Sequence, residues 1–396
     1  MSAPRQAVII AAKRTAFGKI GGMFRSRSAL QLAGPVLRSL HRPFVAAGES
    51  VDEVLMGNVL AGGNVARGAA LEAGLSVSCP ALTLDRQCSS GLDAIVDAAW
   101  RIQAGAADRL LAGGVESSST APWRLEQPRS AREMPRVVSQ APFTGGGMAD
   151  PTMIEGAEAA ARWGAVSRDD QDKLALRSHA KALQAQADGL FAPELVSVFG
   201  QDPETDEGPK AGLTAARLAR LTPLTGPDGS VTIGNSCDKN DGSAAVAIVE
   251  RQVARRMGAT QGLVFLQAAA AGDDPAAPGL AAIAAGRALI QRHWALRGAE
   301  ADSLPDEITA IEFNEAFAGQ TLACLRSLGL SDDDPRVCRK GGALALGHPY
   351  GASGAALVVR LFHECAQAGR EGALVLALLG VAGGQGVAAL FRWQRL

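Results

Sequence analysis

Residues 82–114 read LTLDRQCSSGLDAIVDAAWRIQAGAADRLLAGG, and this stretch decides the fold class. Apolar runs at Ala81–Leu84 and Arg109–Gly113 are typical of buried strands. Between them, Ser89–Ala104 carries apolar residues every three or four positions, which is typical of an amphipathic helix. A strand, a helix and a strand joined by short turns predict an α/β fold with largely parallel sheets.

The same order of elements recurs near the C-terminus, over Leu344–Gly384. There a turn at His348 leads into a predicted helix, Ala352–Ala366, and then into a predicted strand, Ala373–Leu379. Each of the two helices has one apolar stripe, formed by Leu92, Ile95, Val96, Ala99 and Ile102 in the first copy and by Leu357, Val358, Leu361, Phe362 and Cys365 in the second. Two halves of related topology would meet with the turns of Cys88 and His348 at one seam.

Other segments continue this alternation. The predicted strands are Ala7–Ala12, Glu53–Val59, 244–250 and Ile308–Phe313, and the predicted helices are Ala29–Leu40, Ala66–Ala73, Ser167–Gly189, Ala281–Trp294 and Ala316–Leu328. Residues 121–160 differ, because they mix Pro, Arg, Ser and Gly without sustained periodicity. Such a stretch is typical of a long functional excursion or lid. Trp123 and Phe143 in it could line an apolar tunnel, and core packing explains them equally well.

Charge and composition exclude several classes of function. The 396 residues carry 39 basic and 40 acidic side chains without a block of like charge, so we expect no nucleic-acid partner. Six cysteines without a CxxC pair or a His/Cys cluster predict neither a metal site nor a disulfide framework. The N-terminal apolar run is too short for a signal sequence or a membrane span, so we expect a cytoplasmic protein without a membrane partner.

Cys88 is the candidate nucleophile. It lies between a predicted strand and a predicted helix, and the positive end of a helix dipole favours a thiolate. The small residues Ser89, Ser90 and Gly91 follow it and leave room for a substrate. The alternative is a buried, inert cysteine.

His348 is the candidate partner of that thiol. It lies between Gly347 and Pro349 in a turn that opens a helix. A histidine held in this way can activate a thiol or donate a hydrogen bond to an oxyanion. A structural histidine is the alternative, although it would not need the clearance that the surrounding glycines provide.

Asn314 and Glu315 follow the predicted strand Ile308–Phe313. Ligands of open α/β sheets bind outside the carboxyl ends of the strands. An asparagine there can hold a water or a carbonyl oxygen, and a glutamate can orient a neighbouring imidazole. Alternatively, Asn314 caps the helix that begins near Ala316.

Three motifs, in this order and spacing, resemble the thiolase family of acyl-CoA acetyltransferases and 3-ketoacyl-CoA thiolases. They are DRQCSSGLDA at 85–94, NEAFAGQ at 314–320 and GGALALGHPYGASGA at 341–355. The stretches KRTAFGK, MGNVLAGGNVARGAA, LLAGGVESSS, TIGNSCDKNDGSAA and GVAGGQGVAAL extend the resemblance over essentially the whole chain.

The resemblance implies a thiolase fold, with two related βαβαβ-type halves in a layered α/β/α/β/α arrangement and an inserted loop domain. In this chain the N-terminal half would be residues 1–120, completed by 244–270, the loop domain 121–243, and the C-terminal half 271–396. The resemblance also implies a homodimer or homotetramer without a metal or a permanent cofactor. The substrate would be an acyl-CoA, or an acyl-pantetheine on an acyl carrier protein.

The resemblance also implies roles for individual residues. Cys88 would carry the acyl group, and His348 would activate it. Asn314, through a water, and His348 would form one oxyanion site, and the amides of Cys88 and Ala382 would form the other. A non-catalytic subunit that only binds thioesters has no chemical need for Cys88, His348 and Asn314 together.

The turn after the last predicted strand departs from the family. Thiolases usually carry a second reactive cysteine in a Cys-x-Gly-Gly-Gly-x-Gly turn, whereas residues 380–386 read GVAGGQG, so that Gly380 takes its place. General acid–base catalysis by such a group is typically worth about 10²–10⁴-fold. Loss of this second cysteine should impair ordinary Claisen condensation unless another residue takes over its role. Cys237 could supply that thiol, and the alternative is that Cys237 is a buried structural residue. Decarboxylative condensation, or acyl transfer to oxygen, nitrogen or sulfur, avoids the need for it.

The substrate channel of the family is also altered. Gln267 stands where a serine commonly meets the pantetheine, and PGLAAIA at 278–284 replaces a Gly-Thr-Gly-Pro segment. Arg220 is the remaining basic residue of a loop-domain piece that faces the nucleotide of CoA. With Met153, Gln267 and Arg220 are our candidates for the channel, and their changes make a carrier-protein substrate credible.

Overall fold

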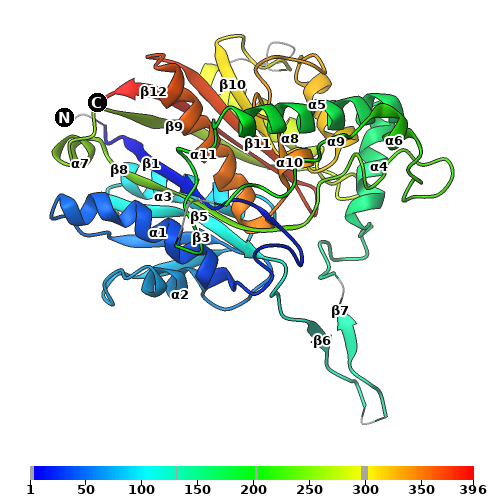
Figure 1. Cartoon of the computed structure of the whole chain (residues 1–396), viewed down its shortest axis with the longest axis horizontal. Coiled ribbons are helices and arrows are strands. Elements are labelled where there is room, and N and C mark those ends of the chain that lie inside the picture. The colour runs from blue at the N-terminus through cyan, green and yellow to red at the C-terminus, as the bar shows by residue number, and fades with distance from the viewer. Residues whose placement is uncertain (1–3, 131, 139, 201–203, 296–301) are drawn as a thin grey trace.

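The computed structural model describes residues 4–130, 132–138, 140–200, 204–295 and 302–396. Within them, most strands join one sheet of ten strands (Figure 1): β1 (Ala7–Arg14), β2 (Gly18–Lys19), β3 (Glu53–Gly57), β4 (Ala81–Leu84), β5 (Arg109–Ser117), β8 (Asn240–Glu250), β9 (Gln261–Gly272), β10 (Ile308–Phe313), β11 (Leu374–Val381) and β12 (Gln385–Arg395). Their order is β10-β11-β12-β9-β1-β8-β5-β3-β4, with β2 paired to β8.

Helices cover both faces of this sheet. They are α1 (Ala29–Ala46), α2 (Val65–Glu72), α3 (Ser90–Gln103), α4 (Met153–Trp163), α5 (Arg168–Ala187), α6 (Ala215–Ala219), α7 (Arg251–Arg256), α8 (Ala281–Trp294), α9 (Ala318–Ser327), α10 (Ala343–Leu346) and α11 (Tyr350–Ala368). A separate hairpin of β6 (Arg124–Glu126) and β7 (Arg136–Val138) projects away from the body of the molecule in Figure 1. The chain therefore has the α/β fold that its sequence predicts.

The sheet is mixed rather than largely parallel. Only the pairs β3–β4, β3–β5 and β10–β11 are parallel among the described strands. The short turn between β11 and β12 forces an antiparallel pair, and β8 and β9 also run antiparallel to their neighbours. The strand β9 pairs along its length with β12 and meets β1 at only two positions. The predicted boundary at residue 270 falls within β9.

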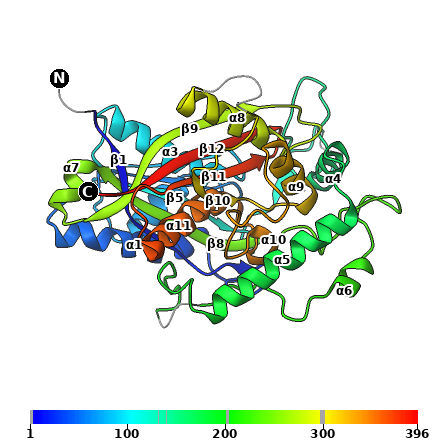
Figure 2. The same ribbon diagram turned by 90° about the horizontal axis from the view of Figure 1, so that it is seen from above.

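Alternating side chains divide the core into three layers of contact. Along β11, Val375, Ala377 and Leu379 face a central cluster, whereas Leu376 and Leu378 face an outer one. The central cluster contains the apolar stripes of α3 and α11 and the inner faces of both sheet halves. The outer clusters contain α1 and α2 on one side and α8 and α9 on the other. Figures 1 and 2 show α11 between the strands of the two halves, which gives an α/β/α/β/α order.

Glycines bring α3 and α11 into backbone contact. A Cβ on Gly91 of α3 would lie 2.6 Å from the carbonyl oxygen of Gly351 in α11. A Cβ on Gly354 would lie 2.7 Å from the amide nitrogen of Leu92. Both spacings are shorter than side chains tolerate, so only glycine lets the N-terminal turns of the two helices meet. The turns that precede them, with Cys88 and His348, are thereby placed at one seam.

The helix α4 lies in the stretch that sequence periodicity left irregular. Thr152 caps it, because its hydroxyl accepts a hydrogen bond from the Glu155 amide and the Glu155 carboxylate accepts one from the Thr152 amide. This reciprocal capping box is visible in the sequence as Thr-x-x-Glu. This motif would have allowed α4 to be predicted from the sequence.

We predict that Gly91→Ala lowers the free energy of unfolding by about 1–3 kcal/mol, as overpacking does in other cores. Gly286→Ala in α8 is the matched control, because its Cβ would meet only the end of the Leu328 side chain, at 3.2 Å. Helix propensity alone would favour alanine at both positions by up to about 1 kcal/mol. Urea denaturation measures both changes, and a Gly91→Ala protein as stable as Gly286→Ala would contradict the close contact.

Candidate active site

Cys88 lies in a tight elbow between β4 and the first residue of α3. Gln87 in this elbow has a φ of 48°, a left-handed conformation that is uncommon for residues other than glycine. The Ser90 hydroxyl accepts a hydrogen bond from the Arg86 amide at 2.8 Å and donates one to the Gln87 carbonyl at 2.6 Å. The first turn of α3 therefore holds the backbone that presents the half-buried Cys88 thiol.

The surroundings of Cys88 favour the neutral thiol. The pKa of Cys88 is raised to about 12, chiefly by burial and to a smaller extent by the negative charges of Glu116 and Asp85. Hydrogen bonds from the amides of Cys88 and Ala382 to the sulfur oppose this shift without overcoming it. The expected gain from the helix N-terminus is outweighed by desolvation. The two amides that we assigned to an oxyanion site nevertheless both point at the sulfur.

The imidazole of His348 is oriented for use as a base. Its Nδ1 lies 2.6 Å from the Ser353 Oγ, and the Ser353 hydroxyl donates to the Pro349 carbonyl at 3.0 Å. The hydroxyl has one proton, so it accepts from Nδ1–H, which leaves the lone pair on Nε2. This Nε2 is buried and has no hydrogen-bond partner among the described residues. Burial lowers the pKa of His348 to about 4, so the ring is neutral at physiological pH.

Asn314 supplies a second unpartnered polar atom. It directly follows β10, and its backbone amide donates to the Leu378 carbonyl at 3.1 Å. Its Nδ2 is buried and lacks a hydrogen-bond partner within the described part of the chain. The helix α9 begins at Ala318 with Phe317 as its N-cap, so Asn314 is not the cap. Buried amide groups without partners are rare in proteins, and at a reactive site they indicate a place for a ligand.

Glu315 is buried beside Asn314, but its hydrogen bonds lead away from the imidazole. Its carboxylate accepts from the Ser178 hydroxyl of α5 at 2.6 Å and from the Leu344 amide of α10. Burial raises its pKa. Glu315 therefore holds α5 and α10 near the site, and Ser353 orients His348 in its place.

Glu116 connects the N-terminal half to the start of α11, and our sequence analysis missed it. Its carboxylate accepts hydrogen bonds from the Asn58 side chain at 2.9 Å and from the amides of Val59 and Leu60 at 3.1 Å. It also accepts one from the Gly351 amide at 3.0 Å, just after His348. Burial raises its pKa to about 7. The signal in the sequence was an acidic residue at the end of an apolar strand in LLAGGVESSS.

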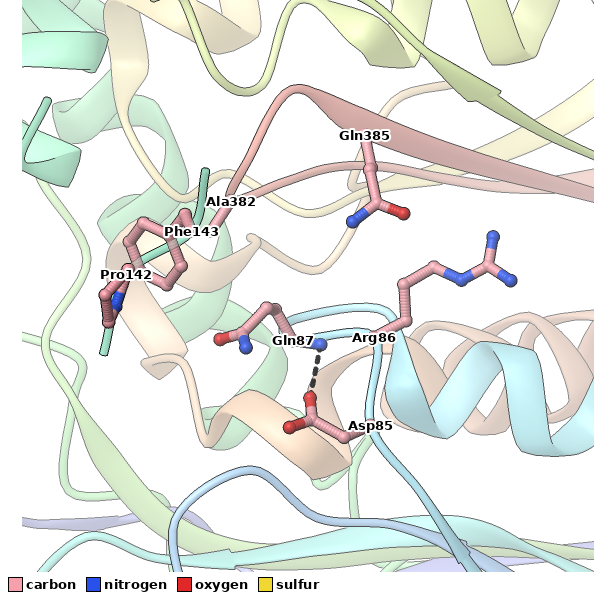
Figure 3. A pocket seen from close by; sticks show the side chains of 7 residues that line it. All are labelled: Asp85, Arg86, Gln87, Pro142, Phe143, Ala382 and Gln385. Carbon is pink, nitrogen blue, oxygen red and sulfur yellow. Dashed lines mark hydrogen bonds between the residues drawn. The ribbon is translucent and has the colours of Figure 1, made fainter. Parts of the chain in front are cut away.

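A cavity of about 350 Å³ opens beside the Cys88 elbow. Its lining residues are Asp85, Arg86, Gln87, Pro142, Phe143, Ala382 and Gln385. Figure 3 shows them around one hollow, with Pro142 and Phe143 near Ala382 and with Gln385 facing Arg86. The lining is mostly polar, so this cavity is not the apolar tunnel that we considered. Phe143 contributes to it, whereas the Trp123 side chain lies on the surface with 87% of its area exposed.

The candidate channel residues lie elsewhere. Gln267 is half-buried in β9, and its side-chain oxygen accepts from the Ala268 amide at 3.0 Å. Arg220 is exposed at the end of α6, and Met153 is the half-buried first residue of α4. None of the three lines the cavity beside Cys88.

Gly380, which our sequence analysis placed at the second cysteine of the family, has no space for a side chain. It lies near the end of β11 and pairs with Gly386 of β12. A Cβ at this position would overlap the carbonyl oxygen and the Cα of Gly279, which precedes α8. The backbone before α8 thus fills the volume that a cysteine would need.

Comparison with known proteins identifies the family. Residues 7–252 match the model of the thiolase N-terminal domain, and residues 264–393 match that of the thiolase C-terminal domain. The chain belongs to the thiolase family. It is 42% identical over 397 residues to a Staphylococcus haemolyticus protein provisionally named acetyl-CoA C-acetyltransferase VraB, covering 99% of this chain and 100% of that protein. A Staphylococcus aureus protein of the same name is 40% identical over 391 residues, with 98% and 99% covered.

A solved structure agrees with this assignment. The crystal structure of the Bacillus anthracis acetyl-CoA acetyltransferase matches with a TM-score of 0.87 and 33% identity over 100% of both chains. This thiolase is therefore an acyltransferase. Among the described residues, no group of three or more His, Cys, Asp or Glu side chains could hold a metal ion. No described helix is long and apolar enough to cross a membrane.

We predict that alkylation of Cys88 by iodoacetamide accelerates continuously from pH 7 to pH 10. The reason is that the raised pKa of the thiol keeps the reactive thiolate scarce until the solution is strongly basic. Peptide mass spectrometry of the modified Cys88 measures the rate. In the urea-unfolded chain, the same thiol should titrate near the ordinary pKa of about 8.5. A plateau below pH 8 in the folded protein would show a stable thiolate–imidazolium pair instead.

We also predict that Gly380→Ala destabilises the protein by about 1–3 kcal/mol, because the methyl group meets backbone that cannot rotate away. Gly272→Ala in β9 is the matched control, since its Cβ would lie 3.9 Å from its nearest neighbour, the Gly384 carbonyl oxygen. Thermal and urea denaturation compare the two variants. Equal stability of both would mean that the segment at Gly279 leaves room for a side chain.

Proposed function

We propose that this thiolase forms an acyl-enzyme on Cys88 from an acyl-CoA or acyl-pantetheine thioester and passes the acyl group to an acceptor. One combination of observations carries the proposal. The amides of Cys88 and Ala382 donate hydrogen bonds to the Cys88 sulfur, and His348 Nε2 and Asn314 Nδ2 are buried without a hydrogen-bond partner among the described residues. The names of the relatives support acetyl-CoA as a donor.

Cys88 and His348 are both uncharged before the substrate binds, so the first step includes a proton transfer between them. The lone pair on His348 Nε2 takes the proton of the Cys88 thiol as the sulfur attacks the thioester carbonyl. The oxygen of the tetrahedral intermediate then needs donors, and each correctly placed donor is typically worth about 10²–10³-fold in rate. The amides of Cys88 and Ala382 form one such pair, and Asn314 with His348 forms the other. Collapse of the intermediate leaves the acyl group on Cys88 and releases the CoA thiolate.

A second candidate function follows from Gly380. With the space beside it filled by Gly279, no group at this position can remove a proton from an acceptor carbon. Decarboxylation of a malonyl thioester would generate the carbanion without a base. Transfer of the acyl group to an oxygen, nitrogen or sulfur nucleophile would need only His348. Either reaction would use the same Cys88 acyl-enzyme.

We predict that acetyl-CoA adds one acetyl group to Cys88 and that Cys88→Ala abolishes the adduct. Intact-mass measurement with peptide mapping detects it, and a thiolase of known activity serves as the control. Absence of an adduct, while the control is acetylated, would reject both candidate functions. Adding acetyl-CoA, malonyl-CoA or an amine to the acyl-enzyme then separates them. Formation of acetoacetyl-CoA from acetyl-CoA alone indicates ordinary condensation, whereas a requirement for malonyl-CoA or an amine indicates the second function.

The assembly and location belong to the same proposal. We expect a homodimer or homotetramer in the cytoplasm, with an acyl-CoA or an acyl carrier protein as the partner that delivers the substrate. Light scattering after size-exclusion chromatography gives the oligomeric state. Comparing acetyl-CoA with an acetylated carrier protein as the donor of the Cys88 adduct shows which thioester is preferred.

A further inference from the structure

The segment Ser236–Lys239, which leads from the loop domain into β8, passes through the active site. Four contacts place it between the turn after β10 and the turn of His348. The Cys237 amide donates to the Ala316 carbonyl at 2.9 Å, Ser236 and Phe317 form a β-bridge, the His348 amide donates to the Asp238 carbonyl at 3.0 Å, and Lys239 and His348 form a second bridge. Cys237 therefore lies between the turn of Asn314 and the turn of His348.

The side chain of Cys237 shares the environment of Cys88. Both thiols are free and half-buried. Burial raises the pKa of Cys237, and the neighbouring Cys88 raises it further. The Tyr350 ring lies at 5.0 Å from the His348 ring, and both thiols raise the pKa of the Tyr350 hydroxyl. The two thiols thus interact electrostatically in a poorly solvated region, and the backbone of Cys237 is tied to the turns that carry Asn314 and His348.

Other ionisable groups near the two thiols either already accept structural hydrogen bonds or are harder to ionise. The oxygens of Glu116 accept four hydrogen bonds that hold the protein together, and Glu315 is bonded to Ser178 and Leu344. Burial raises the pKa of the Tyr350 hydroxyl well above that of an ordinary phenol. We propose that Cys237 is the second catalytic thiol of this enzyme, serving from the loop-domain side in place of a residue at position 380. This inference rests on the Cys88 acyl-enzyme proposed above.

A neutral thiol at rest suits both half-reactions. In the first, His348 takes the Cys88 proton, Cys88 displaces the CoA thiolate, and the Cys237 thiol gives its proton to that thiolate. In the second, the Cys237 thiolate takes a proton from the α-carbon of an incoming acetyl thioester. The carbanion attacks the acyl carbonyl on Cys88, and the released Cys88 thiolate recovers its proton from the His348 imidazolium. Both thiols and the imidazole then return to their starting states, and no other reactant is needed.

The charges around Cys237 change in the direction that this order of reaction steps requires. Acylation leaves Cys88 without a proton to lose, so that of these two thiols Cys237 alone can then ionise. At the same stage His348 carries the proton of Cys88, and a nearby imidazolium stabilises a thiolate. The Cys237 thiolate is therefore most stable while Cys88 carries the acyl group. A base formed only at that point cannot act on the acceptor before the acyl-enzyme exists.

The test compares Cys237→Ala and Cys237→Ser with Cys79→Ala, which removes a buried thiol in the outer cluster of the N-terminal half. We predict that all three variants still acetylate Cys88, whereas both Cys237 variants form acetoacetyl-CoA about 10²–10⁴-fold more slowly. They should also lose exchange of the acetyl-CoA methyl protons with deuterium oxide, measured by NMR. That exchange reports removal of the α-proton, which a merely structural role of Cys237 would not affect selectively.

The possible outcomes are distinguishable. If the unaltered enzyme forms no Cys88 adduct, the proposed function fails. If the adduct forms and Cys237→Ala keeps full condensation and proton exchange, the assignment of Cys237 is wrong. If the adduct forms but even the unaltered enzyme shows neither exchange nor condensation with acetyl-CoA, the assignment is also wrong, and the second candidate function stands. Circular dichroism melts identify a variant that has lost its fold, in which case the milder Cys237→Ser decides.

Discussion

The backbone contact between the first turns of α3 and α11 is the constraint on which the site depends. Cys88 precedes one helix and His348 precedes the other, and the two come from different halves of the chain. Glycine at 91 and 354 lets the helix backbones touch, and the Glu116 carboxylate binds the Gly351 amide across the same seam. The apolar stripes of both helices then fill the central cluster between the sheet halves. Hydrophobic burial thus fixes the distance between two reactive turns that neither half could position alone.

Exclusion of water is the second property of the site, and it follows from the same packing. A thiol, an imidazole and an amide lie in a space where burial shifts the pKa of Cys88 upward and that of His348 downward. Both shifts favour the uncharged forms, so the resting site holds no ion pair. In the proposed mechanism, charge develops only when a thioester is present. At that moment, hydrogen-bond donors in a low-dielectric site act more strongly than they would in water.

Local sequence signals predicted the elements that carry the site. The bounds of β4, α8 and β10 agree with the periodicity, and the seam follows from two similar strand–turn–helix segments. Strands rich in alanine, such as β9 with its run of four alanines, gave no contrast between faces and were missed. The direction of β8 and β9, the packing of Gly279 on Gly380 and the raised pKa of Cys88 depend on contacts between distant segments. No local pattern contains that information.

The close packing of Gly279 on Gly380 limits which parts of the fold can supply catalytic groups. Where the segment before α8 closes over the end of β11, a side chain on that wall of the site is impossible. The segment at Cys237 is a separate part of the fold, tied by backbone hydrogen bonds to the turns of Asn314 and His348. A thiol there is positioned by the same backbone contacts that hold the turns of Asn314 and His348. Under the proposed roles, the acyl carrier and one oxyanion donor, the Cys88 amide, belong to the N-terminal half, the other donors belong to the C-terminal half, and the second thiol lies at the exit of the loop domain. Docking of all three parts then becomes a condition for carbon–carbon bond formation, whereas Cys88 should still be acylated when the second thiol is absent.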